Sequence, residues 1–218
     1  MTVSEVINDV LGDTYKNIVT LSGPSHAEEV IEGHPTTLVS ASPNTKAARA
    51  VQKLFSNETL RIYVNADIKG VELGGSIKNV IAIAAGIVDG IGYGDNTKAA
   101  LLTRGLSEIS RLGAAMGGSV TTFSGLSGIG DLMVTCFSKY SRNRFIGEKI
   151  GKGKSLTEIL KEMSMVAEGV STAESVYQLS KKYRIEMPIS HSVHDILFKE
   201  KDPKTTIHEL MSRELIEE

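Results

Sequence analysis

One lysine, Lys78, stands inside the stretch GGSIKNVIAIAAG (74–86), where nearly every other residue is small or apolar. The stretch has helical length, contains no proline and mixes Ala, Ile and Val, so it predicts a helix that is buried on most sides. At 3.6 residues per turn, Gly74, Ala82 and Ala85 share a face with Lys78. Because glycine inside a helix costs about 1 kcal/mol, this small-residue face indicates close approach by another backbone or by a ligand. Lys78 either extends its ammonium to the surface or is desolvated and suited to moving a proton.

A second candidate cluster lies in SGIGDLMVTCFSKYSRNRFIG (127–147). Asp131 follows a glycine run and precedes an apolar stretch, where it could cap a helix. Ser141 could cap the next helix, whose first amide groups would face an anion that Arg142 grips through its planar guanidinium. The alternative is a solvated basic helix start. The basic pair in SRNR opposes the helix dipole, and such a local conflict favours a binding site.

A third candidate, GPSHAEE (23–29), lies where a predicted strand hands over to a helix. The amide groups around Gly23 and the Ser25 hydroxyl could contact a ligand at the sheet edge, although a plain capped turn explains the same residues. Among the five histidines, only His191 and His194 have a spacing that suits a metal, and no third ligand stands nearby. We therefore predict no metal site.

Two glycine-rich stretches have some features of phosphate-binding loops. GIGYGDN follows a predicted helix rather than a strand, so it fails as a dinucleotide fingerprint. GKGKS (151–155) has Glu148 where a Walker loop needs its first glycine. Both stretches are better explained as turns that end helices.

Composition limits the class of protein. The chain has 218 residues, 41% hydrophobic and 23% charged, which is typical of an ordinary globular protein of one large domain or two small ones. A net charge of −2, 5% aromatic residues and the absence of Trp argue against nucleic-acid binding. The single cysteine, Cys136, is consistent with a reducing cytoplasm. Because we find no signal peptide and no apolar run of about 18 residues, we predict a cytoplasmic protein without membrane insertion.

The order of predicted elements changes along the chain. The first part alternates strands and helices, as in a βαβ layer that forms the end of a larger sheet. Its strands are expected at 17–23, 36–42 and 60–67, and its helices at 24–33 and 44–56, the second helix capped by Asn44 or Thr45. From Asp67 onward the pattern is helical throughout, with one helix expected over 120–137. We place the boundary near residue 66, between an α/β part (1–66) and an all-α part (67–218).

Four stretches together resemble one family over essentially the whole chain: LSGPSHAEEV, GGSIKNVIAIAAGIVDGIGYGDNTKAALLTRGLSEI, SGLSGIGDLMVTCFSKYSRNRFIGEKIGKG and MVAEGVSTAESVYQLS. They are similar to the NAD(P)-dependent glycerol-3-phosphate dehydrogenases of the bacterial soluble type. The resemblance implies the end of a Rossmann-like NAD(P)-binding sheet, followed by an all-α substrate domain of the 6-phosphogluconate-dehydrogenase C-terminal type. It also implies interconversion of dihydroxyacetone phosphate and sn-glycerol 3-phosphate for glycerophospholipid synthesis, with NAD or NADP as cofactor.

The resemblance also implies a role for individual residues. Lys78 is the catalytic residue, which accepts a proton in the oxidation direction and donates one in the reduction direction. The implied substrate contacts are Gly23, Ser25, Lys78, Asp131, Ser141, Arg142 and Asn143. The implied cofactor contacts are Ala27, Arg142, Val166 and Glu168.

The chain departs from the family in one respect. In the family, a GxGxxG loop and a second substrate-contacting lysine precede the stretch that this chain matches. We therefore expect a fragment that has no dehydrogenase activity by itself. Its open sheet edge favours either a homo-oligomer or an aggregation-prone monomer. The alternatives are a catalytically silent helical oligomerisation module and another hydroxyacid or 6-phosphogluconate-type dehydrogenase, although the latter group lacks SRNR. The choice between NAD and NADP stays open.

Overall fold

The computed structural model describes residues 1–12, 17–163, 167–215 and 217, and the chain divides into two compact units. Unit 1 comprises Met1–Lys78 and Ile109–Thr135, and unit 2 comprises Asn79–Glu108 and Cys136–Glu218. The divisions fall inside three helices, α4 (Ile68–Ile91), α5 (Asp95–Ala115) and α7 (Asp131–Phe137). Each of these helices therefore contributes residues to both units.

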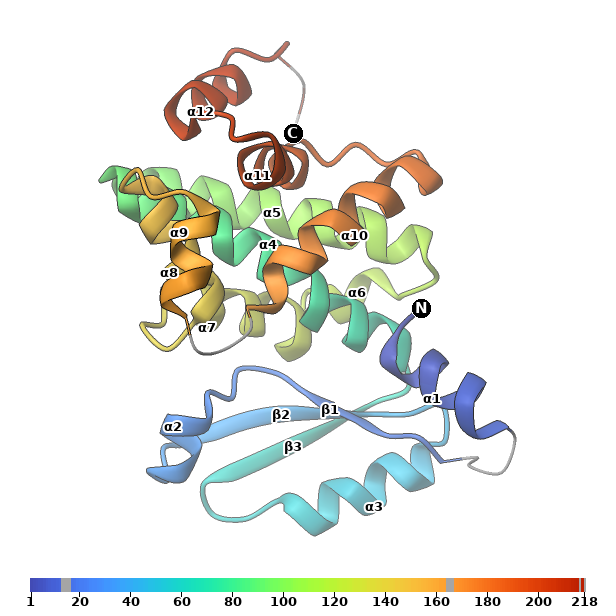
Figure 1. Cartoon of the computed structure of the whole chain (residues 1–218). Helices are drawn as coiled ribbons and strands as arrows, with labels where there is room; N and C mark the ends of the chain where they lie inside the picture. The colour runs from blue at the N-terminus through green and yellow to red at the C-terminus, as the bar shows by residue number, and fades with distance from the viewer. Residues whose placement is uncertain (13–16, 164–166, 216, 218) are drawn as a thin grey trace. The chain divides into compact units, whose positions relative to one another are not determined.

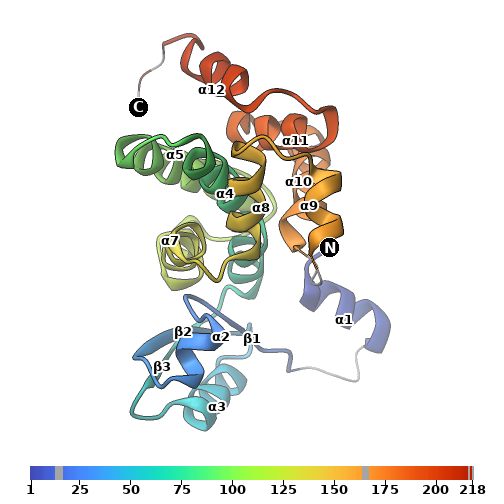
Figure 2. The same ribbon diagram turned by 60° about the vertical axis from the view of Figure 1, so that its left-hand side comes forward.

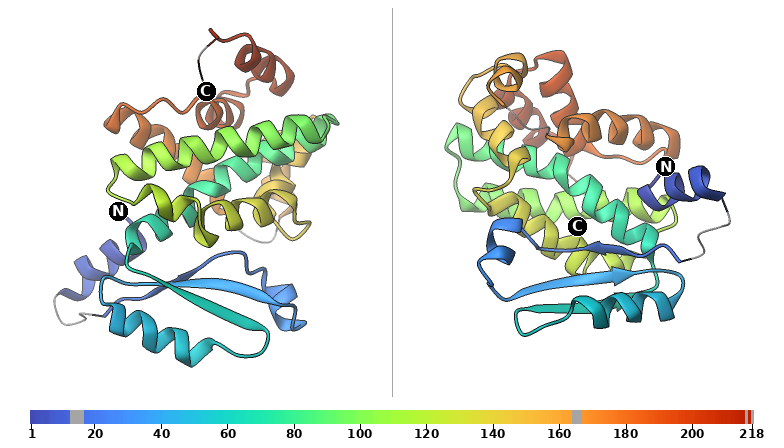
Figure 3. Two further views of the ribbon diagram at one scale, coloured as in Figure 1. Left: turned by 180° about the vertical axis from the view of Figure 1, so that it is seen from behind. Right: turned by 60° about the horizontal axis from the view of Figure 1, so that its bottom comes forward.

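Unit 1 contains a three-stranded sheet in the order β1-β2-β3 (Figures 1 and 3). The strands are β1 (Thr20–Ser22), β2 (Thr36–Ala41) and β3 (Leu60–Asn65). β2 and β3 are parallel, whereas β1 pairs antiparallel with β2. The predicted βαβ pattern is therefore right for β2 and β3 and wrong for β1.

The reversed strand follows from the lengths of the connecting helices. α2 (Ala27–Ile31) has five residues, so it spans only about 8 Å. β2 has six residues and is about 20 Å long, so α2 is too short to carry the chain back along it. α3 (Thr45–Phe55) has 11 residues and connects the two parallel strands.

α3 packs against β2 and β3 and begins at the predicted cap (Figure 1). The Asn44 side chain accepts hydrogen bonds from the amides of Lys46 and Ala47, at 3.1 and 3.4 Å. On the buried side of the helix, the Ser40 hydroxyl donates to the Ala48 carbonyl at 2.9 Å. These contacts confirm Asn44 as the residue that starts the helix.

The sequence analysis missed one helix, α1 (Val3–Leu11). Its signal is the capping box formed by Thr2 and Glu5, in which the Thr2 amide donates to the Glu5 carboxylate at 2.8 Å. The buried carboxylate of Glu72, on α4, accepts hydrogen bonds from the Ser4 amide at 3.0 Å and from the Ser4 and Thr20 hydroxyls. Glu72 thereby joins α1 and β1 to α4 within unit 1.

The stretch 120–137 forms three elements rather than the one predicted helix. They are α6 (Val120–Phe123), the π-helical turn η2 (Leu126–Gly130) and α7. The turn folds back so closely that a Cβ on Gly128 would lie 1.9 Å from the Phe123 carbonyl oxygen. Only glycine permits this approach, so the glycines that fit a helical pattern in fact interrupt the helix.

Unit 2 is helical in all of its regular structure among the described residues (Figure 2). Besides parts of α4, α5 and α7, it contains α8 (Arg142–Gly151), α9 (Leu156–Glu162), α10 (Glu168–Tyr183), α11 (Pro188–Lys199) and α12 (Pro203–Met211). The predicted succession of helices is confirmed. α11 is fixed at its start by the buried carboxylate of Glu108, which accepts hydrogen bonds from the Ile189 and Ser190 amides at 2.6 and 3.0 Å.

Glycines on both helices allow α4 and α8 to cross at close range in unit 2. A Cβ on Gly86 would lie 1.9 Å from the Arg144 carbonyl oxygen, and one on Gly147 would lie 1.9 Å from the Ile83 carbonyl oxygen. The contact is therefore backbone against backbone. It accounts for the glycines of α4 that lie beyond Lys78 in sequence.

By length and composition α4 could cross a membrane, which differs from the prediction based on apolar runs. The Lys78 charge breaks the apolar run, but the helix keeps an 18-residue window of mean hydropathy 1.5. Most of this window is buried inside the protein. Burial of this extent is equally typical of the core helix of a soluble protein.

Candidate active site

The ammonium of Lys78 is hydrogen-bonded to the Asp131 carboxylate within unit 1. The lysine lies midway along α4, and Asp131 is the first residue of α7, directly after η2. Only 16% of the Lys78 side chain and 7% of the Asp131 side chain are exposed. The lysine therefore reaches a buried carboxylate instead of extending into solvent.

The buried surroundings of Asp131 disfavour its ionised form. Burial raises the pKa of the Asp131 carboxyl, and the Lys78 ammonium and a hydrogen bond from Thr135 oppose this effect without cancelling it. The Thr135 hydroxyl donates to the Asp131 carbonyl at 2.6 Å and lies 3.4 Å from the carboxylate. Asp131 belongs to the first turn of α7, so it is not the residue preceding the helix that the capping interpretation requires.

The glycines that precede Lys78 on α4 explain how Asp131 comes close to Lys78. A Cβ on Gly74 would lie 2.6 Å from the Ser127 carbonyl oxygen, in η2. A Cβ on Gly75 would lie 3.1 Å from the Ser22 hydroxyl. The predicted close approach of another backbone to this face is confirmed, and it brings the start of α7 to the side of α4 that carries Lys78.

A pocket of about 410 Å³ opens beside the ion pair. Its lining includes Gly23, Ser25, Lys78 and Asp131, four residues that the sequence singled out. Gly23 has φ +143°, and a Cβ there would lie 3.2 Å from the Thr37 carbonyl oxygen, so a side chain at this position would be both strained and crowded. The structure therefore gathers these predicted residues around one cavity within unit 1.

The same pocket contains residues that the sequence analysis did not identify as site residues. Thr135 lines it, one helical turn after Asp131, and this i, i+4 spacing could have found it. Ser22 and His26 also line it, and both flank the Gly23–Ser25 segment. Ala27, in contrast, begins α2, is exposed, and is not among the residues that line the pocket.

The remaining described candidates, apart from Ala27, lie in unit 2 around the start of α8. The Ser141 hydroxyl accepts a hydrogen bond from the Arg144 amide at 3.2 Å, which confirms the predicted cap. Asn143 is buried, and its side-chain oxygen accepts a hydrogen bond from the Gly169 amide, at 2.9 Å, in the first turn of α10. The Arg142 guanidinium pairs with Glu168 at 2.9 Å. Val166 lies outside the described residues.

The two arginines of SRNR have different surroundings. Arg144 contacts Asp89 at 2.8 Å, and Lys98 contacts the same carboxylate at 2.7 Å. All three side chains are less than 20% exposed. Arg142 and its partner Glu168 are 39% and 53% exposed. Arg144 therefore joins two helices through Asp89, whereas Arg142 is accessible to a ligand.

No group of three or more His, Cys, Asp or Glu side chains could hold a metal ion in the part of the chain that the structure describes. The histidine pair with metal-like spacing has other contacts. His194 stacks on Tyr177 and lies 2.9 Å from Glu174, while His191 lies 2.6 Å from the Ser180 hydroxyl.

Comparison with known proteins decides the family. Residues 67–208 match the model for the C-terminus of NAD-dependent glycerol-3-phosphate dehydrogenase, and residues 1–48 match the model for its N-terminus. The first match covers more than half of the chain. The chain belongs to the NAD-dependent glycerol-3-phosphate dehydrogenase family.

Individual members of the family are similar over nearly the whole chain. The chain is 57% identical over 214 residues to glycerol-3-phosphate dehydrogenase (NAD(P)+) 1 of Salinibacter ruber, covering 98% of this chain and 63% of that protein. It is 55% identical to the Bacillus subtilis glycerol-3-phosphate dehydrogenase (NAD(P)+), covering 97% and 61%. The chain therefore spans less than two thirds of the length of these relatives.

A solved structure of the family confirms the fold. The crystal structure of glycerol-3-phosphate dehydrogenase from Coxiella burnetii superposes with a TM-score of 0.92 at 40% identity, covering 96% of this chain and 64% of that one. The predicted fold class, the end of a Rossmann-like sheet followed by a helical domain of the 6-phosphogluconate-dehydrogenase type, is confirmed for this glycerol-3-phosphate dehydrogenase family member.

Proposed function

We propose that this chain is the substrate-binding and proton-transferring part of an NAD(P)-dependent glycerol-3-phosphate dehydrogenase. The reaction would interconvert dihydroxyacetone phosphate and sn-glycerol 3-phosphate, a precursor of glycerophospholipids, in the cytoplasm. The observation that carries the proposal is the buried Lys78–Asp131 pair beside a pocket, in a chain of this family. The two domains would meet near residue 66, and the whole protein would form a homo-oligomer.

Lys78 suits the proton transfer that this reaction needs. Reduction of a ketone forms a C–H bond from the hydride and an O–H bond from a proton. The Lys78 ammonium would give its proton to the carbonyl oxygen, and in oxidation the amine would take the proton from the hydroxyl. Asp131 would hold the ammonium in position through the hydrogen bond that already joins the pair.

Gly23 and Ser25 would contact the polar part of the substrate. The Ser25 hydroxyl lies 3.3 Å from the Gly23 carbonyl, so both residues belong to one tight turn that lines the pocket. The turn presents backbone groups and a hydroxyl, which suit the hydroxyl groups of a polyol. Thr135 and Ser22, which line the same pocket, would add further hydroxyls.

Arg142, Ser141 and Asn143 would bind the phosphate group. An exposed ion pair contributes only about 0–1 kcal/mol, so Arg142 can exchange Glu168 for a phosphate at small cost. The Asn143 oxygen is already used by the Gly169 amide, which leaves the Asn143 NH₂ group to donate. Ser141 would act by capping α8 and directing its start toward the anion.

The cofactor, NAD or NADP, would supply or accept the hydride when bound. Ala27, Arg142, Val166 and Glu168 would contact it, and the accessible guanidinium of Arg142 fits a phosphate or amide of a dinucleotide. No strand-following stretch in this sequence has the glycine pattern of a pyrophosphate cradle. These residues would therefore provide only part of the cofactor site.

The test uses a hybrid protein in which this chain completes the part of the Bacillus subtilis relative that it does not cover. Lys78→Met should lower the turnover of dihydroxyacetone phosphate by about 10² or more, the usual contribution of a general acid. The KM for substrate should change much less. Nicotinamide absorbance gives the rate for the hybrid, for the variant and for the 218-residue chain.

Two controls make the result specific. Lys69→Met changes a lysine of the same helix that pairs with Glu5 and lies outside the pocket, so it should keep the turnover of the hybrid. The chain alone should show no turnover, because hydride transfer needs the cofactor to be held against the substrate. Normal turnover by the Lys78→Met hybrid would contradict the proposed role of Lys78. A rate near 1 s⁻¹ from the isolated chain would contradict the prediction that it is an inactive part.

A further inference from the structure

A second pocket, of about 500 Å³, lies in unit 2 where α10 ends and α11 begins. It is lined by Ser180, Lys181, Arg184, Ile185, Glu186, Met187, Pro188, His191 and Arg213. None of these residues belongs to the proposed dehydrogenase site. The volume falls in the range of about 300–1,000 Å³ that is usual for small-molecule sites.

Arg184, one of the lining residues, has an unusual backbone conformation. It is the C-cap of α10 and is left-handed, with φ 56° and ψ 44°. Glycine is the usual residue at such a position, because side chains disfavour the left-handed region. Among the described residues only one other non-glycine residue, Glu200, has positive φ. Because Arg184 also lines the pocket, this large cation in a conformation that favours glycine is the side chain to test there.

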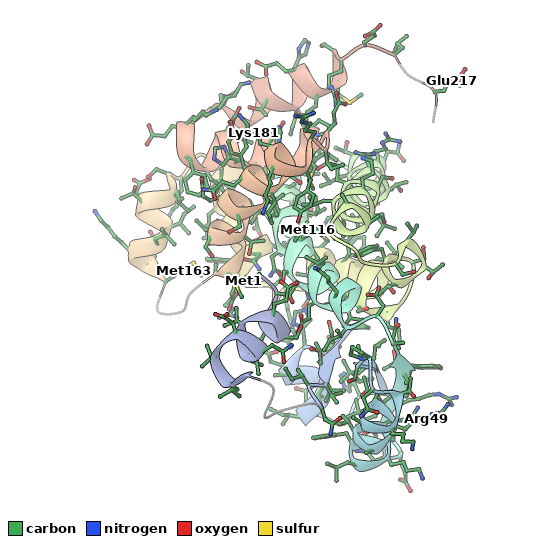
Figure 4. All side chains as sticks on the ribbon, turned by 90° about the vertical axis from the view of Figure 1, so that its right-hand side faces the viewer. Met1, Arg49, Met116, Met163, Lys181 and Glu217 are labelled. Atoms are coloured by element: carbon green, nitrogen blue, oxygen red, sulfur yellow. The ribbon has the colours of Figure 1, made fainter. Side chains whose placement is uncertain are left out.

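The pocket has an excess of positive charge. Lys181, in the last turn of α10 (Figure 4), lines the pocket together with Arg184, Arg213 and one carboxylate, Glu186. Glu186 lies 3.5 Å from Arg213, and the Lys181 ammonium lies 4.5 Å from the centre of the Tyr177 ring. Within the described part of the chain, no ion pair joins Lys181 or Arg184 to a carboxylate. The dipole of α10 explains a lysine in its last turn, but it does not explain an arginine in a left-handed conformation.

The remaining walls are apolar or already hydrogen-bonded. Met187 is fully buried, and Ile185 and Pro188 stand beside it. The first amides of α11 donate to Glu108, so they are not available to a ligand. Recognition in this pocket would therefore come from the cationic side chains, together with an apolar surface for the rest of the ligand.

We propose that this pocket is a second ligand site that binds small phosphate monoesters. Two planar guanidinium groups and an ammonium match a phosphate group, and guanidinium groups bind phosphate through paired hydrogen bonds. The apolar wall formed by Ile185, Met187 and Pro188 would contact the organic part of the ester. The site does not depend on the dehydrogenase activity proposed above, because it shares no residue with that site.

The experiment titrates isotope-labelled protein with phenyl phosphate, inorganic phosphate and benzyl alcohol, and follows NMR signals of Ile185 and His191. All samples carry Arg142→Gln, so that the proposed dehydrogenase site does not contribute. Phenyl phosphate should give saturable shifts at these two residues and bind more tightly than inorganic phosphate. Benzyl alcohol, which lacks the anion, should give none.

Two variants test the role of the guanidinium while preserving the fold. Arg184→Gly removes the side chain and places glycine where the backbone favours it, so it should fold normally and weaken phenyl phosphate binding at least about tenfold. Glu200→Gly makes the same backbone change at the C-cap of α11, outside the pocket, and should leave the affinity unchanged. Equal affinities in these two variants would overturn the proposal. So would an affinity for inorganic phosphate equal to that for phenyl phosphate, shifts caused by benzyl alcohol, or no saturable shifts.

Discussion

Two ion pairs in this molecule join similar groups in different surroundings. Lys78 and Asp131 meet in a buried setting, with 16% and 7% of their side chains exposed. Arg142 and Glu168 meet at the surface, with 39% and 53% exposed. A buried pair cannot lose one member without leaving a desolvated charge, whereas an exposed pair can exchange its partner for water or for a ligand. The buried pair therefore suits fixed chemistry, and the exposed pair suits reversible binding.

The largest expected effect comes from breaking the buried pair. Lys78→Met should lower the free energy of unfolding of the 218-residue chain by about 3–5 kcal/mol at neutral pH, because Asp131 would remain buried without its cation. Urea unfolding followed by circular dichroism gives the value. Lys69→Met, which removes a lysine from an exposed pair on the same helix, should cost less than about 1 kcal/mol.

The double variant Lys78→Met/Asp131→Leu separates the loss of the pair from the effect of an unpaired charge. Replacing both members with apolar residues should recover most of the stability lost in Lys78→Met. A double variant as unstable as the single one would mean that packing, rather than the stranded carboxylate, causes the loss.

The second effect concerns ligand exchange at the exposed pair. In the hybrid protein, Arg142→Lys should weaken the binding of dihydroxyacetone phosphate by about 1.5–3 kcal/mol, the value of a hydrogen bond to a charged group. An ammonium cannot reproduce the two parallel hydrogen bonds of the guanidinium. Calorimetric titration measures the affinity, and urea unfolding of the same variant should show little change in stability. Unchanged affinity would identify Arg142 as a solvated helix residue.

The third effect is the pH dependence of the buried pair. Burial raises the pKa of Asp131 in the folded chain. Protonated Asp131 therefore stabilises the folded state at pH values below its pKa in the unfolded chain, which is about 3.9. This stabilisation is lost as the pH rises through the folded pKa. Relative to Asp131→Asn, the unmodified chain should therefore lose stability as the pH rises from about 4, by at most about 1.4 kcal/mol per pH unit. The opposite slope would show that the Lys78 charge outweighs burial.

The features that sequence could predict are those set by neighbouring residues. Asn44 and Ser141 were identified as caps because a cap acts within three residues, and the helix around Lys78 follows from its composition. The turn η2, which directs Asp131 to Lys78, was missed because LSGIG fits a helical pattern locally. Its shape depends on contacts with the Phe123 carbonyl and with Gly74, which only the folded chain brings together.

The same distinction applies to the two ion pairs. The partner of Lys78 lies 53 residues away and that of Arg142 lies 26 residues away, so no periodicity connects them. Resemblance to a family singled out all four residues, but it did not show that two of them form a buried pair and two an exposed one. The degree of burial depends on how the surrounding helices pack, and it is this packing that distinguishes the two pairs.

The smallest expected effect completes the comparison. Glu168→Gln removes the carboxylate of the exposed pair, and Arg142 should then turn to water, so the free energy of unfolding should fall by less than about 1 kcal/mol. Raising the salt concentration to about 1 M, where the screening length is only about 3 Å, should abolish even this difference.

The matched control is Glu174→Gln, on the same helix. Glu174 is hydrogen-bonded at 2.9 Å to the His194 ring, which is only 7% exposed, so its effect should persist in salt. Urea unfolding of both variants at low and high salt gives the four values. A large, salt-resistant loss in Glu168→Gln would mean that the Arg142–Glu168 pair is as firmly held as the buried one, and that Arg142 is not free to exchange its partner for a ligand.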